Sequence, residues 1–284
     1  MKRIENQRFD EERALYHLTD TEVINCEFAG EQDGESVLKE ARNIKAEDCR
    51  FALRYPFWHN EDFSLKGVVL EEATRAALWY CKNGKILDAK MRGIKALREC
   101  DRIELCGCDI ISDEFGWKCS RIKLSQGAVQ SEYLFLDSSD IELTDIRMKG
   151  KYSFQYVDRL TISHSVLDTK DAFWHSKNTV VRDSVVKGEY VGWYSENLTL
   201  INCQIEGTQP FCYCKGLKLI NCTMNNCDLS FEYSQVEADI IGHIDSVKNP
   251  LSGTITADSV GTVILEDAVM PCSGSVILRD THRT

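Results

Sequence analysis

Apolar and polar positions along this chain form a pattern that returns every nineteen residues. Nine blocks follow one another without a gap, starting at residues 75, 94, 113, 132, 151, 170, 189, 208 and 227. Blocks starting at Glu35 and Arg54 join this series once two inserted residues, Ala73-Thr74, are set aside. A weaker block starts at Glu12 and is followed by an insertion at residues 31–34. All five tryptophans fall at position 5 of their blocks: Trp58, Trp79, Trp117, Trp174 and Trp193.

Within each block the apolar residues alternate with polar ones. Positions 10 and 12 are aliphatic or aromatic while position 11 is polar or charged, as in Ile103-Glu104-Leu105. Positions 15 and 17 repeat this alternation, which is typical of half-buried strands. Asn or Asp at position 14 and Gly at position 19 indicate turns. With positions 2–7 as a further strand, three short strands per block predict one coil of a parallel β-helix.

These coils predict an all-β protein, a right-handed parallel β-helix solenoid of about twelve 19-residue coils, since parallel crossovers prefer the right hand. A leucine-rich repeat is excluded because it would need a helical side. A left-handed β-helix is excluded because its repeat is a hexapeptide, and nineteen is not a multiple of six. We expect the β-helix to span residues 1–245, with residues 1–11 as an N-terminal cap. Residues 246–284 lose the period and predict a small C-terminal β cap, with strands at 254–257, 262–265 and 275–278.

Composition narrows the classes of partner. The net charge of −11 disfavours nucleic acid or an anionic membrane. No signal core or membrane-spanning apolar run is present, which predicts a cytoplasmic location. The thirteen cysteines then read as reduced, structural thiols on inward columns. No histidine completes a zinc ligand set, and no phosphate loop or dinucleotide motif occurs, so we expect no metal and no cofactor.

Several runs resemble an uncharacterised bacterial family of domain-of-unknown-function proteins, a branch of the pectin-lyase-like β-helices. They are Gly34 to Glu40, Arg54 to His59, Lys170 to Trp174, Gly188 to Ser195 and Ser246 to Pro250. The resemblance spans nearly the whole chain and implies the fold. It implies no catalytic residues, because the family has no established activity.

Alternation over positions 2–7 predicts which residues face water. Position 6 is polar and position 7 is small, so positions 2, 4 and 6 should point outward and positions 3, 5 and 7 inward. The tryptophan column at position 5 is then expected in the core. The phenylalanine and leucine column at position 4 is expected on the surface, beside tyrosines at position 2.

This outer face is the predicted site, centred between the blocks that start at Asp113 and Glu189. Phe135, Phe154 and Phe173 would be the platform on which sugar rings stack. Hydroxyl and amino groups would come from Tyr152, Tyr156, Tyr190, Tyr194 and Lys118. Asp137 and His175 are the candidate acid/base groups, with Glu99 as a second carboxylate. Glu99 and Asp137 lie two coils apart, roughly 9–10 Å, near the separation in inverting glycosidases.

The face therefore predicts a carbohydrate-binding or carbohydrate-processing protein; as an enzyme it would be a polysaccharide or oligosaccharide hydrolase or lyase. Two alternatives use the same residues. In the first alternative the face is a homo-oligomer or partner interface, since tyrosine and phenylalanine are common at interfaces. In the second, neighbouring segments of the chain cover the face. Glu99, Lys118 and Asp137 also fit a plain cross-strand ion ladder.

Overall fold

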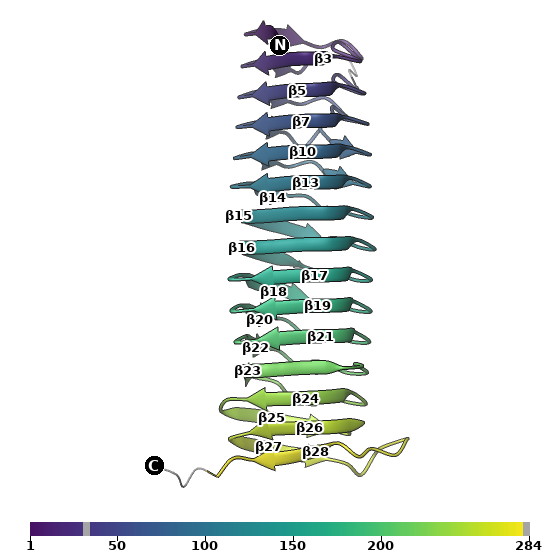
Figure 1. The fold of residues 1–284 in the computed structure, drawn as a ribbon, viewed down its shortest axis with the longest axis vertical. Coiled ribbons are helices and arrows are strands. Elements are labelled where there is room, and N and C mark those ends of the chain that lie inside the picture. The colour runs from purple at the N-terminus through teal and green to yellow at the C-terminus, as the bar shows by residue number, and fades with distance from the viewer. Residues whose placement is uncertain (31–34, 281–284) are drawn as a thin grey trace. The chain divides into compact units, whose positions relative to one another are not determined.

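The computed structural model describes residues 1–30 and 35–280, and the regular elements among these residues are all β-strands. The chain forms two compact units, Met1–Arg147 and Met148–Thr284. Each unit is a parallel β-solenoid, and the chain makes about 14 turns in all. In Figure 1 the front strands of each unit run to the left as the coils descend, which is a right-handed winding. No helix in the described part of the chain is long and apolar enough to cross a membrane.

The described residues of unit 1 contain fifteen strands, and a sixteenth, β16, begins in unit 1 and ends in unit 2. In chain order they are β1 (Lys2–Glu5), β2 (Arg8–Phe9), β3 (Thr19–Ile24), β4 (Glu27–Phe28), β5 (Arg42–Glu47), β6 (Arg50–Phe51), β7 (Glu61–Lys66), β8 (Val69–Leu70), β9 (Leu78–Trp79), β10 (Lys82–Leu87), β11 (Lys90–Met91), β12 (Leu97–Arg98), β13 (Asp101–Cys106), β14 (Asp109–Ile111), β15 (Ser120–Glu132) and β16 (Ser139–Lys151).

The remaining twelve strands belong to unit 2. They are β17 (Asp158–Ser163), β18 (Val166–Lys170), β19 (Lys177–Arg182), β20 (Val185–Lys187), β21 (Glu196–Ile201), β22 (Gln204–Glu206), β23 (Leu217–Asn225), β24 (Gln235–Ile240), β25 (His243–Lys248), β26 (Ser252–Ala257), β27 (Ser259–Ile264) and β28 (Ser275–Leu278).

Strand pairing confirms the nineteen-residue register. In unit 1, Lys82 of β10 pairs with Asp101 of β13, nineteen residues later. In unit 2, Asp158 of β17 pairs with Lys177 of β19 at the same spacing. The pairing of Glu61 with Lys82 spans twenty-one residues and so absorbs the two-residue insertion. Coils within each unit therefore stack in register, apart from one shift between β23 and β24.

The apolar columns at positions 10, 12, 15 and 17 form the core, as predicted. Ile103 and Leu105 are at most 1 % exposed at positions 10 and 12. Cys203 and Ile205 are each 1 % exposed at positions 15 and 17. These positions lie on true strands, where the side chain alternates faces at every residue.

Positions 2–7 correct the expectation of a third strand. Apart from the two-residue strands β9 and β12, this segment is a series of turns. In the coil that starts at Lys170, Asp171, Phe173 and His175 have φ of 55°, 61° and 54°. Left-handed φ at every second residue changes the direction of the side chains, so the two-residue alternation of a strand does not apply here.

Both ends of the chain take part in the winding. β1 and β2 pair with β3 and β4, so most of residues 1–11 already forms a coil. The strands expected at 254–257, 262–265 and 275–278 are present within β26, β27 and β28. β24 pairs with β26, and β26 with β28, so coils of altered length continue past residue 245. This explains why twelve coils were expected and about 14 turns are found.

Candidate binding face

The phenylalanine column of the predicted site is buried, which corrects the expected platform. Phe135, Phe154 and Phe173 are each 0 % exposed. Within unit 2 the rings of Phe154 and Phe173 stack on each other in the core, 5.3 Å apart. A ligand on the surface cannot reach these rings. Leu134, Ser153 and Ala172, the residues before them, are buried as well, so positions 3 and 4 both face inward.

The tryptophan column lies at the surface instead of in the core, and its side chains are half-buried. The indole nitrogen of Trp174 donates to the backbone oxygen of Tyr190 at 2.8 Å, and that of Trp193 donates to Gln209 at 2.8 Å. In both cases the acceptor lies at position 2 of the following coil. Each tryptophan therefore covers part of the next coil while its ring remains partly accessible.

Position 6 faces outward as predicted and carries an aromatic ladder in unit 2. His175 stacks on Tyr156 at 4.9 Å and on Tyr194 at 5.0 Å, with rings within 8° of parallel. Tyr194 stacks in turn on Tyr213 at 4.8 Å. Tyr156 is 55 % exposed and Tyr194 is 42 % exposed. The ladder continues beside the tryptophans, since Trp193 contacts both Tyr194 and Tyr213 edge-on.

We call this surface the unit 2 aromatic face. It consists of Tyr156, Trp174, His175, Tyr190, Trp193, Tyr194 and Tyr213. Because both ring faces of His175 and of Tyr194 are covered by neighbouring rings, the face presents ring edges and hydroxyl groups to solvent. Such edges offer hydrogen bonds and a positive quadrupole rim rather than a flat π surface.

Asp171 lies in the same part of unit 2, in the position 2 column between Tyr152 and Tyr190. It is 5 % exposed, and its carboxylate makes no hydrogen bond or ion pair within 4 Å to another described residue. Burial raises the pKa of the Asp171 carboxyl, an effect only partly opposed by Lys170 and Lys151. Only a small part of Asp171 is therefore open to solvent.

Two lysines frame this carboxyl. The amino group of Lys170 lies 2.6 Å from Glu189 and 5.2 Å from the centre of the Tyr190 ring. The amino group of Lys151 lies 4.3 Å from the centre of the Tyr152 ring. Position 2 thus combines two tyrosine rings, each with a cation over it, and one carboxyl between them.

The three predicted acid/base residues are divided between the two units. Glu99 and Asp137 belong to unit 1, and His175 belongs to unit 2. The Glu99 carboxylate accepts hydrogen bonds from the indole of Trp79 at 3.2 Å and from Arg98 at 3.5 Å. Glu99 is therefore tied to its neighbours.

The ion ladder expected as the alternative does not form in unit 1. Lys118 makes no ion pair within 4 Å with any described residue. Arg98, at position 5, instead places its guanidinium 5.1 Å from the ring centres of both Trp79 and Trp117. A cation between two indoles explains why an arginine is tolerated in the tryptophan column.

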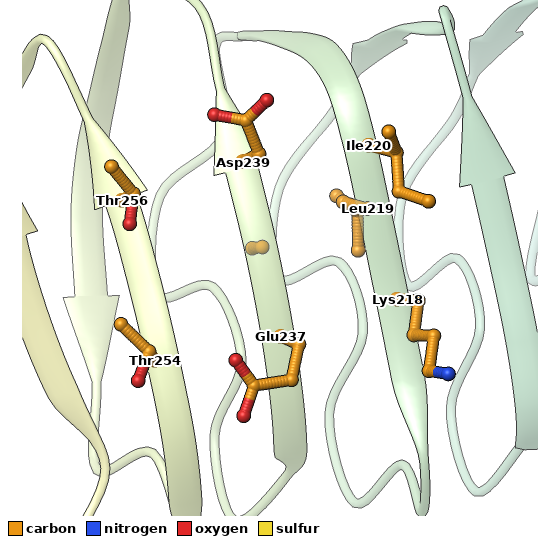
Figure 2. A pocket seen from close by; sticks show the side chains of 8 residues that line it. Lys218, Leu219, Ile220, Glu237, Asp239, Thr254 and Thr256 are labelled. Atoms are coloured by element: carbon orange, nitrogen blue, oxygen red, sulfur yellow. The ribbon is translucent and has the colours of Figure 1, made fainter.

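A second surface feature lies on the outer face of β23, β24 and β26. It is a shallow depression of about 340 Å³ (Figure 2). Glu237 and Asp239 project from β24, with Lys218 on one side and threonines of β26 on the other. The pairing of β23 with β24 shifts between Leu219 and Cys222. Ile220, within the shifted stretch, is 46 % exposed, and a bulge of this kind has no signal in the nineteen-residue pattern.

Two solved structures are similar to this chain over most of its length. The A-module of the mannuronan C-5 epimerase AlgE4 of Azotobacter vinelandii is 9% identical, with a TM-score of 0.36, and the match covers 94% of this chain and 90% of that one. PfbA, a surface adhesin of Streptococcus pneumoniae, is 7% identical, with a TM-score of 0.40, and coverages of 96% and 81%. These likenesses concern the fold. No curated protein matches the sequence significantly.

One family model, described as "Protein of unknown function (DUF3737)", matches residues 2–277. The match covers nearly the whole chain, including both units. It confirms the expected resemblance to an uncharacterised β-helix family.

Proposed function

Because the chain belongs to the DUF3737 family of proteins of unknown function, its activity must be argued from its own residues, and we propose that the unit 2 aromatic face binds carbohydrate. The observation that carries this proposal is the ladder of Tyr156, His175, Tyr194 and Tyr213, with ring centres 4.8–5.0 Å apart and two of its tyrosines more than 40 % exposed. A sugar polymer lying along the ladder would meet a hydrogen-bonding group on every coil.

The mode of contact differs from ring stacking. The ring faces within the ladder are covered by one another, so phenol hydroxyls and the imidazole edge would contact the ligand. Tyrosine hydroxyls both donate and accept, which suits the hydroxyl groups of sugars. Half-buried indoles beside the ladder supply apolar contact for the C–H surfaces of the ligand.

The proposal covers binding and assigns no reaction. Glu99, which was expected to serve as a second catalytic carboxylate, is hydrogen-bonded to Trp79 and Arg98 in unit 1. Within unit 2, His175 contacts two phenol rings. Neither arrangement is that of a paired acid and base around one scissile bond.

Calorimetric titration with neutral oligosaccharides tests the proposal, after a glycan array has identified a binder. Tyr194→Ala should weaken binding about tenfold or more, because it removes a central rung. Tyr80→Ala is the matched control: Tyr80 also occupies position 6, is 40 % exposed and stacks on a histidine, but lies in unit 1. Equal losses in both variants, or no binding by the wild type, would contradict the proposal.

A second candidate function is a protein interface on the same face. The outward edges of tyrosine and tryptophan match the composition of interaction hot spots. This candidate predicts self-association that Tyr194→Arg abolishes. Light scattering over a range of concentrations, with and without oligosaccharide, separates it from carbohydrate binding.

A further inference from the structure

The tryptophan column is interrupted in several coils, and one of these breaks lies beside Asp171. Trp117, Trp174 and Trp193 each donate an indole hydrogen bond to the position 2 carbonyl of the following coil. In the coil that precedes Asp171, position 5 is Gln155, which is shorter and half-buried. No side chain of the described residues donates to the Asp171 carbonyl. The indole cover found on other coils is therefore replaced here by an amide.

The result is a small area rich in hydrogen-bond acceptors. The carboxylate and the carbonyl of Asp171 both lack donors among the described residues, although the residue is only 5 % exposed. An acceptor in such a setting is unfavourable unless a donor reaches it. Water or a ligand hydroxyl can supply that donor, and Gln155 adds an amide that both donates and accepts.

Charged groups of both signs act on the Asp171 carboxyl. They are the ammonium groups of Lys151 and Lys170 and the carboxylate of Glu189. Tyr152 and Tyr190 lie on either side of Asp171 in the position 2 column. An acidic ligand at this place would meet the carboxylates of Asp171 and Glu189, whereas a neutral ligand brings no charge that needs a partner.

We infer that Asp171 and Gln155 form a subsite that accepts hydrogen bonds from the hydroxyl groups of a neutral sugar, such as a vicinal diol. The inference rests on the proposed carbohydrate binding by unit 2 and gives it a ligand class. A carboxylate oxygen accepts a hydroxyl hydrogen bond strongly, and its two oxygens can take two neighbouring hydroxyls.

Two substitutions test the subsite from opposite directions. Asp171→Asn keeps the shape and removes the carboxylate. Gln155→Trp restores the residue that position 5 carries on other coils, and should close the subsite while remaining compatible with the fold. Both should weaken binding of neutral gluco-, manno- or xylo-oligosaccharides about tenfold or more. Asp168→Asn, at an exposed position of β18 in the same coil as Gln155, is the control and should bind like the wild type.

The outcomes separate the subsite from the wider proposal. Wild-type binding of neutral oligosaccharides, weakened in both variants, supports the inference. Wild-type binding that both folded variants retain overturns the subsite but leaves carbohydrate binding intact. Tighter binding of oligogalacturonate than of neutral oligomers overturns the ligand class. Absence of binding to any glycan removes the proposed function and the subsite together. Circular dichroism and thermal melting show whether each variant folds. If Gln155→Trp does not fold, Asp171→Asn alone tests the subsite.

Discussion

Backbone φ at single residues decides which columns of this protein face water. In the coil that starts at Lys151, Tyr152, Phe154 and Tyr156 have φ of 57°, 62° and 57°. An L-residue rarely takes this conformation, so a sequence gives little warning of it. Positions 2–7 are not a strand, so the period-two alternation does not hold there. The phenylalanine column therefore lies in the core and the tryptophan column at the surface, the reverse of the prediction.

Phe173→Ala tests the burial of position 4. The ring is 0 % exposed and stacks on Phe154. Its removal should lower the free energy of unfolding by about 3–5 kcal/mol, because a cavity is left in a packed core. Tyr194→Ala on the surface should lower it by about 1 kcal/mol, the worth of an aromatic contact. Urea denaturation measures both; similar small losses would mean that Phe173 is exposed after all.

Asp171 gives a pH-dependent prediction. Burial raises the pKa of the Asp171 carboxyl in the folded protein. The contribution of this group to the free energy of unfolding is therefore present below the ordinary carboxyl pKa, and it is lost as the pH rises through the raised pKa. Asp171→Asn should therefore raise the melting temperature at about pH 7, and this gain should vanish near pH 3.5.

The carboxyl of Asp101 has a pKa shift of the opposite sign and serves as a comparison. Burial raises its pKa, but hydrogen bonds from Arg121 and Ser120 outweigh this and lower the value overall. Its contribution is present above the ordinary pKa and is lost as the pH falls through the lowered one. Asp101→Asn should thus lower the melting temperature at neutral pH and lose this effect in acid. Parallel pH profiles for the two variants would contradict the assignment.

Part of the binding face was predictable from single residues. The polarity of position 6 placed Tyr156, His175 and Tyr194 on the surface, where they are. Asp171 was visible only as a break in a tyrosine column and Gln155 only as a break in a tryptophan column. Their significance depends on hydrogen bonds between coils, which the sequence does not display.

At the scale of the element, the coil is the unit that the sequence predicts well. Positions 8–13 and 16–17 are strands whose side chains do alternate, so periodicity located them and their core columns. One exception is β16, which continues through Gly150, where the pattern predicts a turn. A strand can bend at a corner of the coil without ending.

The coil also predicts where extra residues are tolerated. Both natural insertions, residues 31–34 and Ala73-Thr74, fall between position 19 of one block and position 1 of the next. One residue inserted between Gly207 and Thr208, at the same junction, should leave the fold intact. One residue inserted after Leu198 within β21 should unfold unit 2, because it sends the following side chains to the opposite face. Far-UV circular dichroism and limited proteolysis distinguish the two.

At the scale of the whole molecule, the reactivity of the cysteines measures how completely solvent and reagents are excluded from the core. Eleven of thirteen are buried, and Cys106 and Cys272 are half-buried. Burial raises the pKa of Cys49, Cys108 and Cys214 to about 11, so these thiols remain protonated at neutral pH. Iodoacetamide should label two cysteines per native chain and all thirteen after denaturation. Mass spectrometry counts the adducts, and rapid native labelling of Cys203 or Cys214 would show that the coils open.

The left-handed residues at positions 2, 4 and 6 also bear on the order in which the chain can fold. Each such residue costs about 1–2 kcal/mol in isolation, and the coils of unit 2 repeat the set, as in Gln209, Phe211 and Tyr213. One coil alone therefore sits above the unfolded chain in free energy. Hydrogen bonds to an adjacent coil, such as that from the Phe211 amide to Val191, offset the cost. A finished coil acts as the template for its neighbour, so each unit should grow by addition at an existing edge rather than by collapse of separate coils.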